Sequence, residues 1–305
     1  MRQPGQPARI VPEAPRPGDT LGIVAPASAV QKDQFEAGCA ALRERGFKVF
    51  FFESILDREL YFAGDHARRA WELEQMFLKP FVKAVICARG GYGSNYLPAK
   101  LRPELFHDNP KMFMGYSDQT TLLTWLCDQC DLVTYHGPMV AKDWAENGES
   151  QEELRTSGFA IERSTEVAQL RPGQAEGVLY GGCLSLLAAS LGTDYEIQTD
   201  GTVLFMEDVN AKPYQIDRML MQLRHAGKLD SVRGIVFGEM LDCHQPGGQE
   251  YTLQEVVLQA LDGLEMPIGW GVPSGHVSRP PNRILPIGAR ASLVVEEKKV
   301  TLRTS

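Results

Sequence analysis

The chain has 305 residues, of which 43% are hydrophobic and 23% charged, values that are ordinary for a globular protein and argue against extensive disorder. Its formal net charge is -8 and it has no basic run, so we expect no nucleic-acid partner. The proline-rich N-terminus lacks the apolar core of a secretory signal, and no apolar stretch has membrane length. We therefore expect a cytoplasmic protein without a membrane partner.

The first half of the chain alternates short apolar strands with helical patterns. The predicted elements are a strand at 20–26, a helix at 33–46, strands at 47–52, 82–91, 111–116 and 132–138, and helices at 66–78 and 118–130. Continuous apolar strands separated by helices indicate an α/β fold in which helices cover both faces of a parallel sheet. Ligands bind such sheets outside the carboxyl ends of the strands.

Residues 146–175 are polar, weakly periodic and rich in turn residues, so we interpret them as a linker between an N-terminal domain, 1–145, and a C-terminal domain, 176–305. The second domain is predicted to be mixed α/β. Its expected elements are strands at 176–182, 202–208 and 232–240, helices at 183–192, 212–227 and 252–264, and a hairpin at 283–304.

Six cysteines are scattered through the chain, which fits reduced thiols better than a disulfide framework. Cys127 and Cys130 form a CxxC pair inside a predicted helix. A redox or zinc site is the alternative, but the sequence offers no second pair of ligands, so we interpret both as ordinary helix residues. We expect neither a metal nor a cofactor.

An apolar strand ends at Gly115-Tyr116-Ser117-Asp118 and runs directly into a helix. This is the arrangement of a nucleophile elbow, which exposes the Ser117 hydroxyl and places the N–H of Asp118 where an oxyanion could bind. Gln119 occupies the last glycine position of the GxSxG pattern, so a slightly looser turn is expected. Alternatively, Ser117 or Asp118 is simply the N-cap of the helix.

A glycine-rich loop, Arg89-Gly90-Gly91-Tyr92-Gly93-Ser94, follows the predicted strand at 82–91. Gly90 and Gly91 have no side chains, so this loop can bring a backbone N–H close to a ligand and supply the other half of an oxyanion hole. A phosphate-binding loop is the alternative. The loop lacks the lysine of a P-loop and does not match GxGxxG.

A serine nucleophile needs a base, usually histidine. His136 at a strand end and His276 in a Gly/Pro-rich loop are both candidates, and spacing alone does not choose between them. Glu207 and Asp208 end an apolar strand, and strand alternation places them on opposite faces, so only one should face an imidazole. Asp208 could instead brace the turn that follows.

Five segments together resemble the LD-carboxypeptidase family, the muramoyltetrapeptide carboxypeptidases. They occur in order as ARGGYGSNYLP, MGYSDQTTLL, TYHGPM, LFMEDVNAKPYQIDRML and GVPSGHVSRPPNRILPIG, and the likeness runs from about residue 18 to the C-terminus. The resemblance implies a triad of Ser117, Glu207 and His276, with His136 in a supporting role. It also implies a Rossmann-like N-terminal domain that carries the serine, a C-terminal domain that carries the other two residues, and a homodimer.

By the same resemblance, the substrate is a cytoplasmic murein tetrapeptide that loses its terminal D-alanine from meso-diaminopimelate during peptidoglycan recycling. The reaction would pass through an acyl-enzyme, with the N–H groups of Gly91 and Asp118 binding the oxyanion. The free carboxylate of the leaving residue calls for a cation or a helix N-terminus. The candidates for binding substrate are Ser28, Arg89, Gly90, Arg279 and Arg283.

Two other functions are compatible with these motifs. Microcin C immunity peptidases resemble the same family, but they carry an aromatic stacking residue on an inserted loop near the acid. The path from Gly177 to Glu207 is short and contains Tyr180, Tyr195 and Phe205 as its aromatic residues. The second alternative is a noncatalytic ligand-binding protein in which Gly90 and Gly91 receive an anion.

Overall fold

The structure is a computed structural model that describes residues 9–148, 154–155, 157–164, 169–245, 247 and 250–305. It contains two compact units. The first unit consists of Pro7–Ser157 together with Arg279–Gly288, and the second contains Gly158–Ser278 and Ala289–Ser305. A ten-residue segment late in the sequence therefore belongs to the same unit as the N-terminal half.

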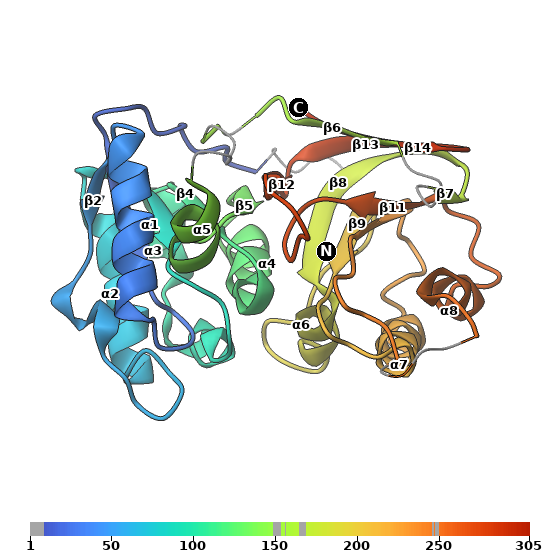
Figure 1. Cartoon of the computed structure of the whole chain (residues 1–305), viewed down its shortest axis with the longest axis horizontal. Coiled ribbons are helices and arrows are strands. Elements are labelled where there is room, and N and C mark those ends of the chain that lie inside the picture. The colour runs from blue at the N-terminus through green and yellow to red at the C-terminus, as the bar shows by residue number, and fades with distance from the viewer. Residues whose placement is uncertain (1–8, 149–153, 156, 165–168, 246, 248–249) are drawn as a thin grey trace. The chain divides into compact units, whose positions relative to one another are not determined.

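The first unit contains a six-stranded sheet in the order β12-β5-β4-β3-β1-β2 (Figure 1). Strands β1 to β5 run parallel to their neighbours, and β12 is antiparallel to β5. Every residue of β4 is buried, as expected for a central parallel strand. The strands are β1 Thr20–Val24, β2 Lys48–Phe50, β3 Val82–Cys87, β4 Met112–Gly115, β5 Thr134–His136 and β12 Leu285–Ile287.

Helices cover both faces of this sheet. The chain reverses its direction across the sheet after β2, and right-handed crossovers then place the preceding and following helices on opposite faces. Helix α1 packs against η5 and α5, whereas α2, α3 and α4 pack in succession (Figure 1). Their bounds are α1 Lys32–Glu44, α2 His66–Leu78, α3 Pro103–Asp108, α4 Thr120–Gln129, the π-helical turn η5 Val140–Trp144 and α5 Ala145–Asn147.

The second unit contains an eight-stranded mixed sheet in the order β6-β14-β13-β8-β9-β10-β11-β7. Strands β8 to β11 are parallel, and the remaining neighbours are antiparallel. Helices α6 Leu184–Ala189, α7 Pro213–His225 and α8 Leu253–Ala260 connect the four parallel strands. The strands are β6 Ala160–Ser164, β7 Gln169–Arg171, β8 Gly173–Cys183, β9 Thr202–Glu207, β10 Gly234–Gly238, β11 Ile268–Val272, β13 Arg290–Glu296 and β14 Lys299–Thr304.

The α/β class and the parallel N-terminal sheet agree with the sequence prediction, but two regions differ. The stretch expected to be a linker contributes the edge strands β6 and β7, although its residues 149–153, 156 and 165–168 lie outside the description. The predicted C-terminal hairpin is formed by β13 and β14 alone. The residues before it form β12, which pairs with β5, because Gly288 at φ +99° lets the chain turn between the two strands.

Side-chain contacts fix the returning segment within the first unit. The buried Cys127 thiol donates to the carbonyl of Ile287, with the two atoms 3.1 Å apart. The Asn282 amide donates to the buried carboxylate of Asp143 over 3.1 Å.

All six cysteines are free and buried, and burial raises the pKa of Cys127 to about 11. The CxxC residues are therefore protonated thiols with packing roles.

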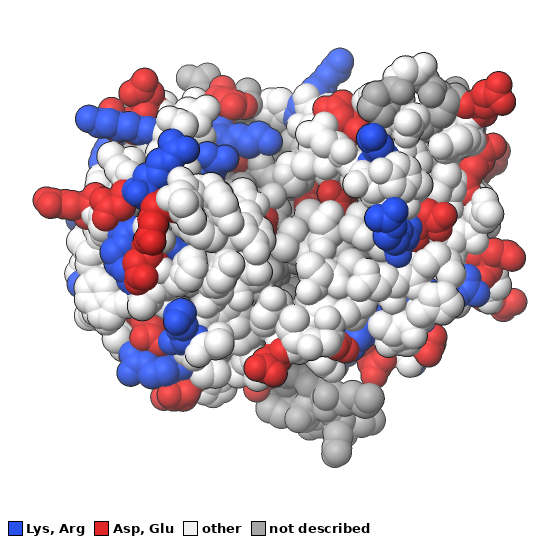
Figure 2. Space-filling model, turned by 90° about the horizontal axis from the view of Figure 1, so that it is seen from below, with Lys and Arg blue, Asp and Glu red and all other residues white. Residues whose placement is uncertain are grey.

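Charged side chains of both signs are interspersed on the face shown in Figure 2, and no broad basic area appears there. Within the described ranges, each helix is too short or too polar to cross a lipid bilayer.

Candidate active site

Ser117 lies at a tight turn between β4 and α4. Its φ is +63°, a left-handed conformation that is strained for a residue with a side chain. The residues Ser117–Gln119 form one 3-10 turn, η4, before the α-helix begins at Thr120. The absent final glycine of the pattern therefore does not relax the turn. Ser117 has the backbone conformation of a nucleophile elbow, and no side-chain cap bond is formed at the start of η4 or α4.

The glycine loop after β3 lies directly against this turn. A Cβ atom added to Gly90 would lie 2.9 Å from Cβ and 3.1 Å from Oγ of Ser117, so only glycine allows this approach. Gly91 has φ +102°, and an added Cβ there would overlap the side chain of Ser28. The structure thus brings Gly90 and Ser117 together, with Ser28 on the other side of the loop.

Two side chains from the turn hold the ends of the glycine loop. The amide of Gln119 donates to the carbonyl of Arg89 over 2.9 Å. The Asp118 carboxylate accepts the N–H of Ser94 over 2.8 Å, and the Ser94 hydroxyl donates to the Asp118 carbonyl over 2.5 Å. Sequence reasoning missed Gln119 and Ser94, because it treated the first as a departure from a motif and the second as a loop residue.

Asp118 is almost completely buried, at 1% exposure. Burial raises the pKa of its carboxyl group, while the hydrogen bond from the Ser94 N–H and the positive charge of Arg69 oppose that rise. A buried carboxylate is expensive unless hydrogen-bond donors surround it. The Asp118 side chain therefore holds the glycine loop in place through Ser94, while its backbone lies in the 3-10 turn that follows Ser117.

In the second unit, Glu207 and His276 are in direct contact. The Glu207 Oε2 atom lies 2.7 Å from Nδ1 of His276 and accepts the backbone N–H of the same histidine over 3.0 Å. Glu207 is fully buried at the end of β9, whereas His276 is 8% exposed. A carboxylate can only accept, so Nδ1 carries a ring proton, and in the neutral form of this tautomer Nε2 is the acceptor nitrogen. This is the arrangement of an imidazole base held by an orienting acid.

Asp208 points elsewhere, as strand alternation predicted. Its carboxylate accepts the backbone N–H and the hydroxyl of Ser185, over 2.9 and 2.6 Å, and the N–H of Val209 over 2.8 Å. Burial raises its pKa, and the hydroxyl of Ser185 opposes the rise. Asp208 therefore braces the start of α6.

Two further residues shape the histidine loop and were not identified from the sequence. A Cβ atom on Gly238 would lie 2.6 Å from Cβ of Glu207, so glycine at the end of β10 makes room for the acid. Glu239 accepts the N–H and the hydroxyl of Ser278, over 2.9 and 2.6 Å. The carboxylates at the ends of two adjacent strands thus hold the same loop, one at residue 276 and one at residue 278.

The remaining candidates are spread over the first unit. The Arg89 guanidinium donates to the carbonyl of Ala29 over 3.0 Å, and Ser28 accepts the N–H of Tyr92 over 3.0 Å. Arg279 is exposed and Arg283 is partly buried. His136 is fully buried beside the Tyr116 ring, with ring centroids 6.0 Å apart, which leaves its imidazole poorly placed to meet a substrate.

Two domains of one protein family match this chain in succession. Residues 21–137 match the N-terminal domain of LD-carboxypeptidases, and residues 176–293 match their C-terminal domain. The chain belongs to the LD-carboxypeptidase family. As a member of it, the chain is a serine carboxypeptidase, and hence a hydrolase.

Individual relatives cover nearly the whole chain. A probable murein peptide carboxypeptidase of Bacillus subtilis is 36% identical, and the match spans 95% of this chain and 93% of the relative. The microcin C7 self-immunity protein of Escherichia coli is 26% identical over 93% of each chain. The crystal structure of the muramoyltetrapeptide carboxypeptidase from Oxalobacter formigenes superimposes with a TM-score of 0.83 at 26% identity, covering 94% of this chain and 98% of that one.

Proposed function

We propose that this LD-carboxypeptidase removes the terminal D-alanine from murein tetrapeptide, cleaving the bond to the L-configured centre of meso-diaminopimelate during peptidoglycan recycling. The observation that carries the proposal is the 2.7 Å contact between Nδ1 of His276 and Glu207, which supplies an oriented base. The strained turn at Ser117 supports it from the other unit. Relatives named for murein peptides support the choice of substrate.

In the proposed mechanism, the Ser117 hydroxyl attacks the carbonyl carbon of the diaminopimelate residue. Nε2 of His276 accepts the hydroxyl proton, and Glu207 stabilises the imidazolium that forms. The carbonyl oxygen becomes an oxyanion, which the N–H groups of Gly91 and Asp118 would bind. The tetrahedral intermediate then expels D-alanine, whose amine takes the proton from His276.

The second half of the reaction reverses these roles. Water attacks the ester between Ser117 and the tripeptide while His276 takes a proton from the water. The bond between the Ser117 oxygen and the carbonyl carbon then breaks, and the serine oxygen takes the proton from His276. The tripeptide leaves with a new carboxyl group. Each step uses protein side chains and water, without a cofactor.

Recognition of the D-alanine carboxylate calls for a cation or a helix N-terminus near the leaving group. Arg89 and Arg279 are the proposed candidates. Arg89 already donates to Ala29, which fixes the position of its guanidinium. Gly90 follows Arg89 in the glycine loop and Ser28 contacts the same loop, so both would shape the space around the leaving residue.

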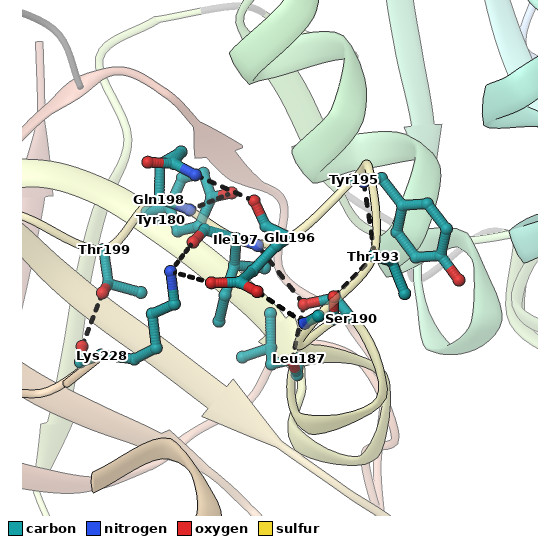
Figure 3. A network of polar contacts seen from close by, with 11 residues as sticks. Tyr180, Leu187, Ser190, Thr193, Tyr195, Glu196, Ile197, Gln198, Thr199 and Lys228 are labelled. Atoms are coloured by element: carbon teal, nitrogen blue, oxygen red, sulfur yellow. Dashed lines mark hydrogen bonds and ion pairs between the residues drawn. The ribbon is translucent and has the colours of Figure 1, made fainter. Parts of the chain in front are cut away.

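Cleavage of an aminoacyl-nucleotide toxin is the second candidate, favoured by the similarity to the microcin C7 self-immunity protein. The segment between α6 and β9, shown in Figure 3, argues against this second activity because polar contacts hold it in place. The Lys228 ammonium is 2.6 Å from the Glu196 carboxylate and donates to the carbonyl of Ile197 over 2.9 Å, so the segment is pinned to the domain. The Tyr195 ring points away from this network, on a segment with no long insertion.

Mass spectrometry of the products from murein tri-, tetra- and pentapeptides tests the proposal. Wild type should convert the tetrapeptide to tripeptide and D-alanine, and Ser117→Ala should lower this turnover by roughly three to six orders of magnitude with the fold intact. Near-normal release of D-alanine by Ser117→Ala would remove the serine from the mechanism. Preferential cleavage of an aminoacyl sulfamoyl nucleotide would favour the second candidate. Tight nucleotide binding without hydrolysis would indicate a noncatalytic protein.

We further propose that the protein acts in the cytoplasm as a homodimer. Six buried free thiols are compatible with a reducing compartment. Light scattering at several protein concentrations would measure the oligomeric state, and a mass equal to one chain throughout would reject the dimer.

A further inference from the structure

Arg69 is a charged residue in the interior of the first unit that the mechanism above does not use. It lies on α2 and is 1% exposed. The centre of its guanidinium is 5.1 Å from the centroid of the Phe62 ring. A cation is excluded from such a place unless hydrogen-bond acceptors replace its water.

Backbone carbonyls from three separate loops provide those acceptors. Nε donates to the carbonyl of Gly64 over 3.2 Å, and Nη1 donates to the carbonyl of Gly93 over 3.0 Å and to that of Pro26. Pro26 belongs to the loop after β1 and Gly93 to the loop after β3. One side chain therefore ties together the two loops that carry Ser28 and Gly91.

The guanidinium of Arg69 has one further contact, with the imidazole of His66. Nη2 lies against Nδ1 of His66, which must accept, because arginine only donates. Burial and the charge of Arg69 lower the pKa of His66, which keeps that imidazole neutral and able to accept. His66 in turn stacks on the Tyr96 ring, with centroids 4.1 Å apart.

The loop held by Arg69 is also the loop held by the turn at Ser117. Gly93 is followed by Ser94, whose N–H and hydroxyl bind Asp118. Gly93 has φ +126°, and an added Cβ there would lie 2.6 Å from Phe62 and 3.3 Å from Nη1 of Arg69. The loop is thus fixed from one side by Asp118 and from the other by Arg69.

We propose that Arg69 is a positioning residue for the oxyanion hole: its guanidinium sets the spacing of the loops after β1 and β3, and thereby the position of Gly91 relative to Ser117. The inference rests on the proposed serine mechanism. Arginine suits this role because its planar fork reaches several carbonyls in fixed directions, whereas lysine offers one flexible point charge.

The test compares Arg69→Ala and Arg69→Lys with the matched control Arg68→Ala. Arg68 lies on the same helix and also donates to backbone carbonyls, those of Ser54 and Ala63, but it contacts neither of the two loops. The measurements are kcat and KM for D-alanine release, the rate at which a fluorophosphonate modifies Ser117, and the melting temperature of each variant.

We expect Arg69→Ala to lower both kcat and the phosphonylation rate by about 10²–10³, the usual loss for a disabled oxyanion donor, with KM close to wild type. Guanidinium chloride, at concentrations well below denaturing ones, should restore part of both rates, whereas sodium chloride should not. Because guanidinium chloride lowers the stability of a folded protein, a gain in rate would mean that guanidinium replaces the missing side chain and not that it stabilises the fold. Arg69→Lys should show a smaller loss of the same kind, and it carries the test if Arg69→Ala does not fold.

Two results would overturn the inference in different ways. Folded Arg69 variants with kcat and phosphonylation rates equal to those of Arg68→Ala would exclude Arg69 while leaving the serine mechanism intact. Absence of phosphonylation at Ser117 in the wild-type protein would reject the serine mechanism itself, and the role of Arg69 with it.

Discussion

Gln119 donates its side-chain amide to the carbonyl of Arg89 over 2.9 Å, and so joins the turn after β4 to the loop after β3. The residue is completely buried. Its Cγ atom lies where a Cβ on Gly115 would meet it at 3.0 Å, so a glycine two residues before Ser117 makes room for this side chain. The apparent departure from the elbow pattern is a contact that positions the glycine loop.

Replacing Gln119 by leucine keeps the side-chain size and removes the donor. We expect kcat to fall by about one to two orders of magnitude, because the loop bearing Gly91 loses one of its anchors. The free energy of unfolding should fall by about 1–3 kcal/mol, the cost of an unsatisfied buried carbonyl. Urea unfolding and D-alanine release would measure both effects, and exposed Gln129→Leu on α4 serves as the control.

The two histidine candidates are distinguished by substitution. His276→Ala should lower kcat by roughly three to six orders of magnitude, since the proposed triad acts as a unit. His136→Ala should damage activity less, because that imidazole is buried beside Tyr116, but it should lower the melting temperature. Initial rates and thermal melts would measure these changes. The reverse ranking of activities would show that His136 is the base.

The carboxylate that orients His276 can be neutralised with little change in shape. Glu207→Gln should lower kcat by roughly 10³–10⁴, because an amide does not stabilise the imidazolium and can hold the wrong tautomer. Glu239→Gln is the matched control, since Glu239 binds the same loop through Ser278 and does not contact the imidazole. Equal losses in the two variants would argue that Glu207 only holds the backbone.

Stability should depend on pH through Lys111, which donates to the carbonyls of Met76 and Lys79 at the end of α2. Burial lowers its pKa from 10.5 to about 8. Between these two values the unfolded chain binds more protons than the folded one, so this residue makes stability rise with pH there. The free energy of unfolding of wild type relative to Lys111→Met should increase across that window. The same comparison made with exposed Lys48→Met serves as the control.

Periodicity and apolar runs were sufficient to predict the five parallel strands of the first sheet, because strands such as β3 and β4 are apolar and largely buried and lie between amphipathic helices. The turn at Ser117 was also predictable, since a strand that ends in Gly-x-Ser before a helix has few conformations. The resemblance to a family, rather than spacing, selected His276 over His136. In the structure Glu207 contacts His276 and Asp208 does not, in agreement with the alternation of side chains along a strand.

Other features depend on contacts that no local pattern encodes. Strand β12 is three residues long and pairs with a strand about 150 positions earlier, as Leu285 and His136 show. Arg69 lies in a charged helical run, HARRAWELE, where arginine is usually exposed. Arg69 can be buried because the carbonyls of Pro26, Gly64 and Gly93 accept its hydrogen bonds, and these three residues are brought together only by the fold.

Because β12 belongs to the first unit, no single cut in the chain separates the two units into complete fragments. A fragment that stops at residue 157 would leave unpaired the edge of β5 that binds β12 antiparallel, and an unpaired strand edge promotes aggregation. A separately supplied peptide covering Arg279–Gly288 could close that edge. Strand β12 thus completes a sheet whose first strand lies more than 250 residues earlier, so the first unit must wait for its final strand.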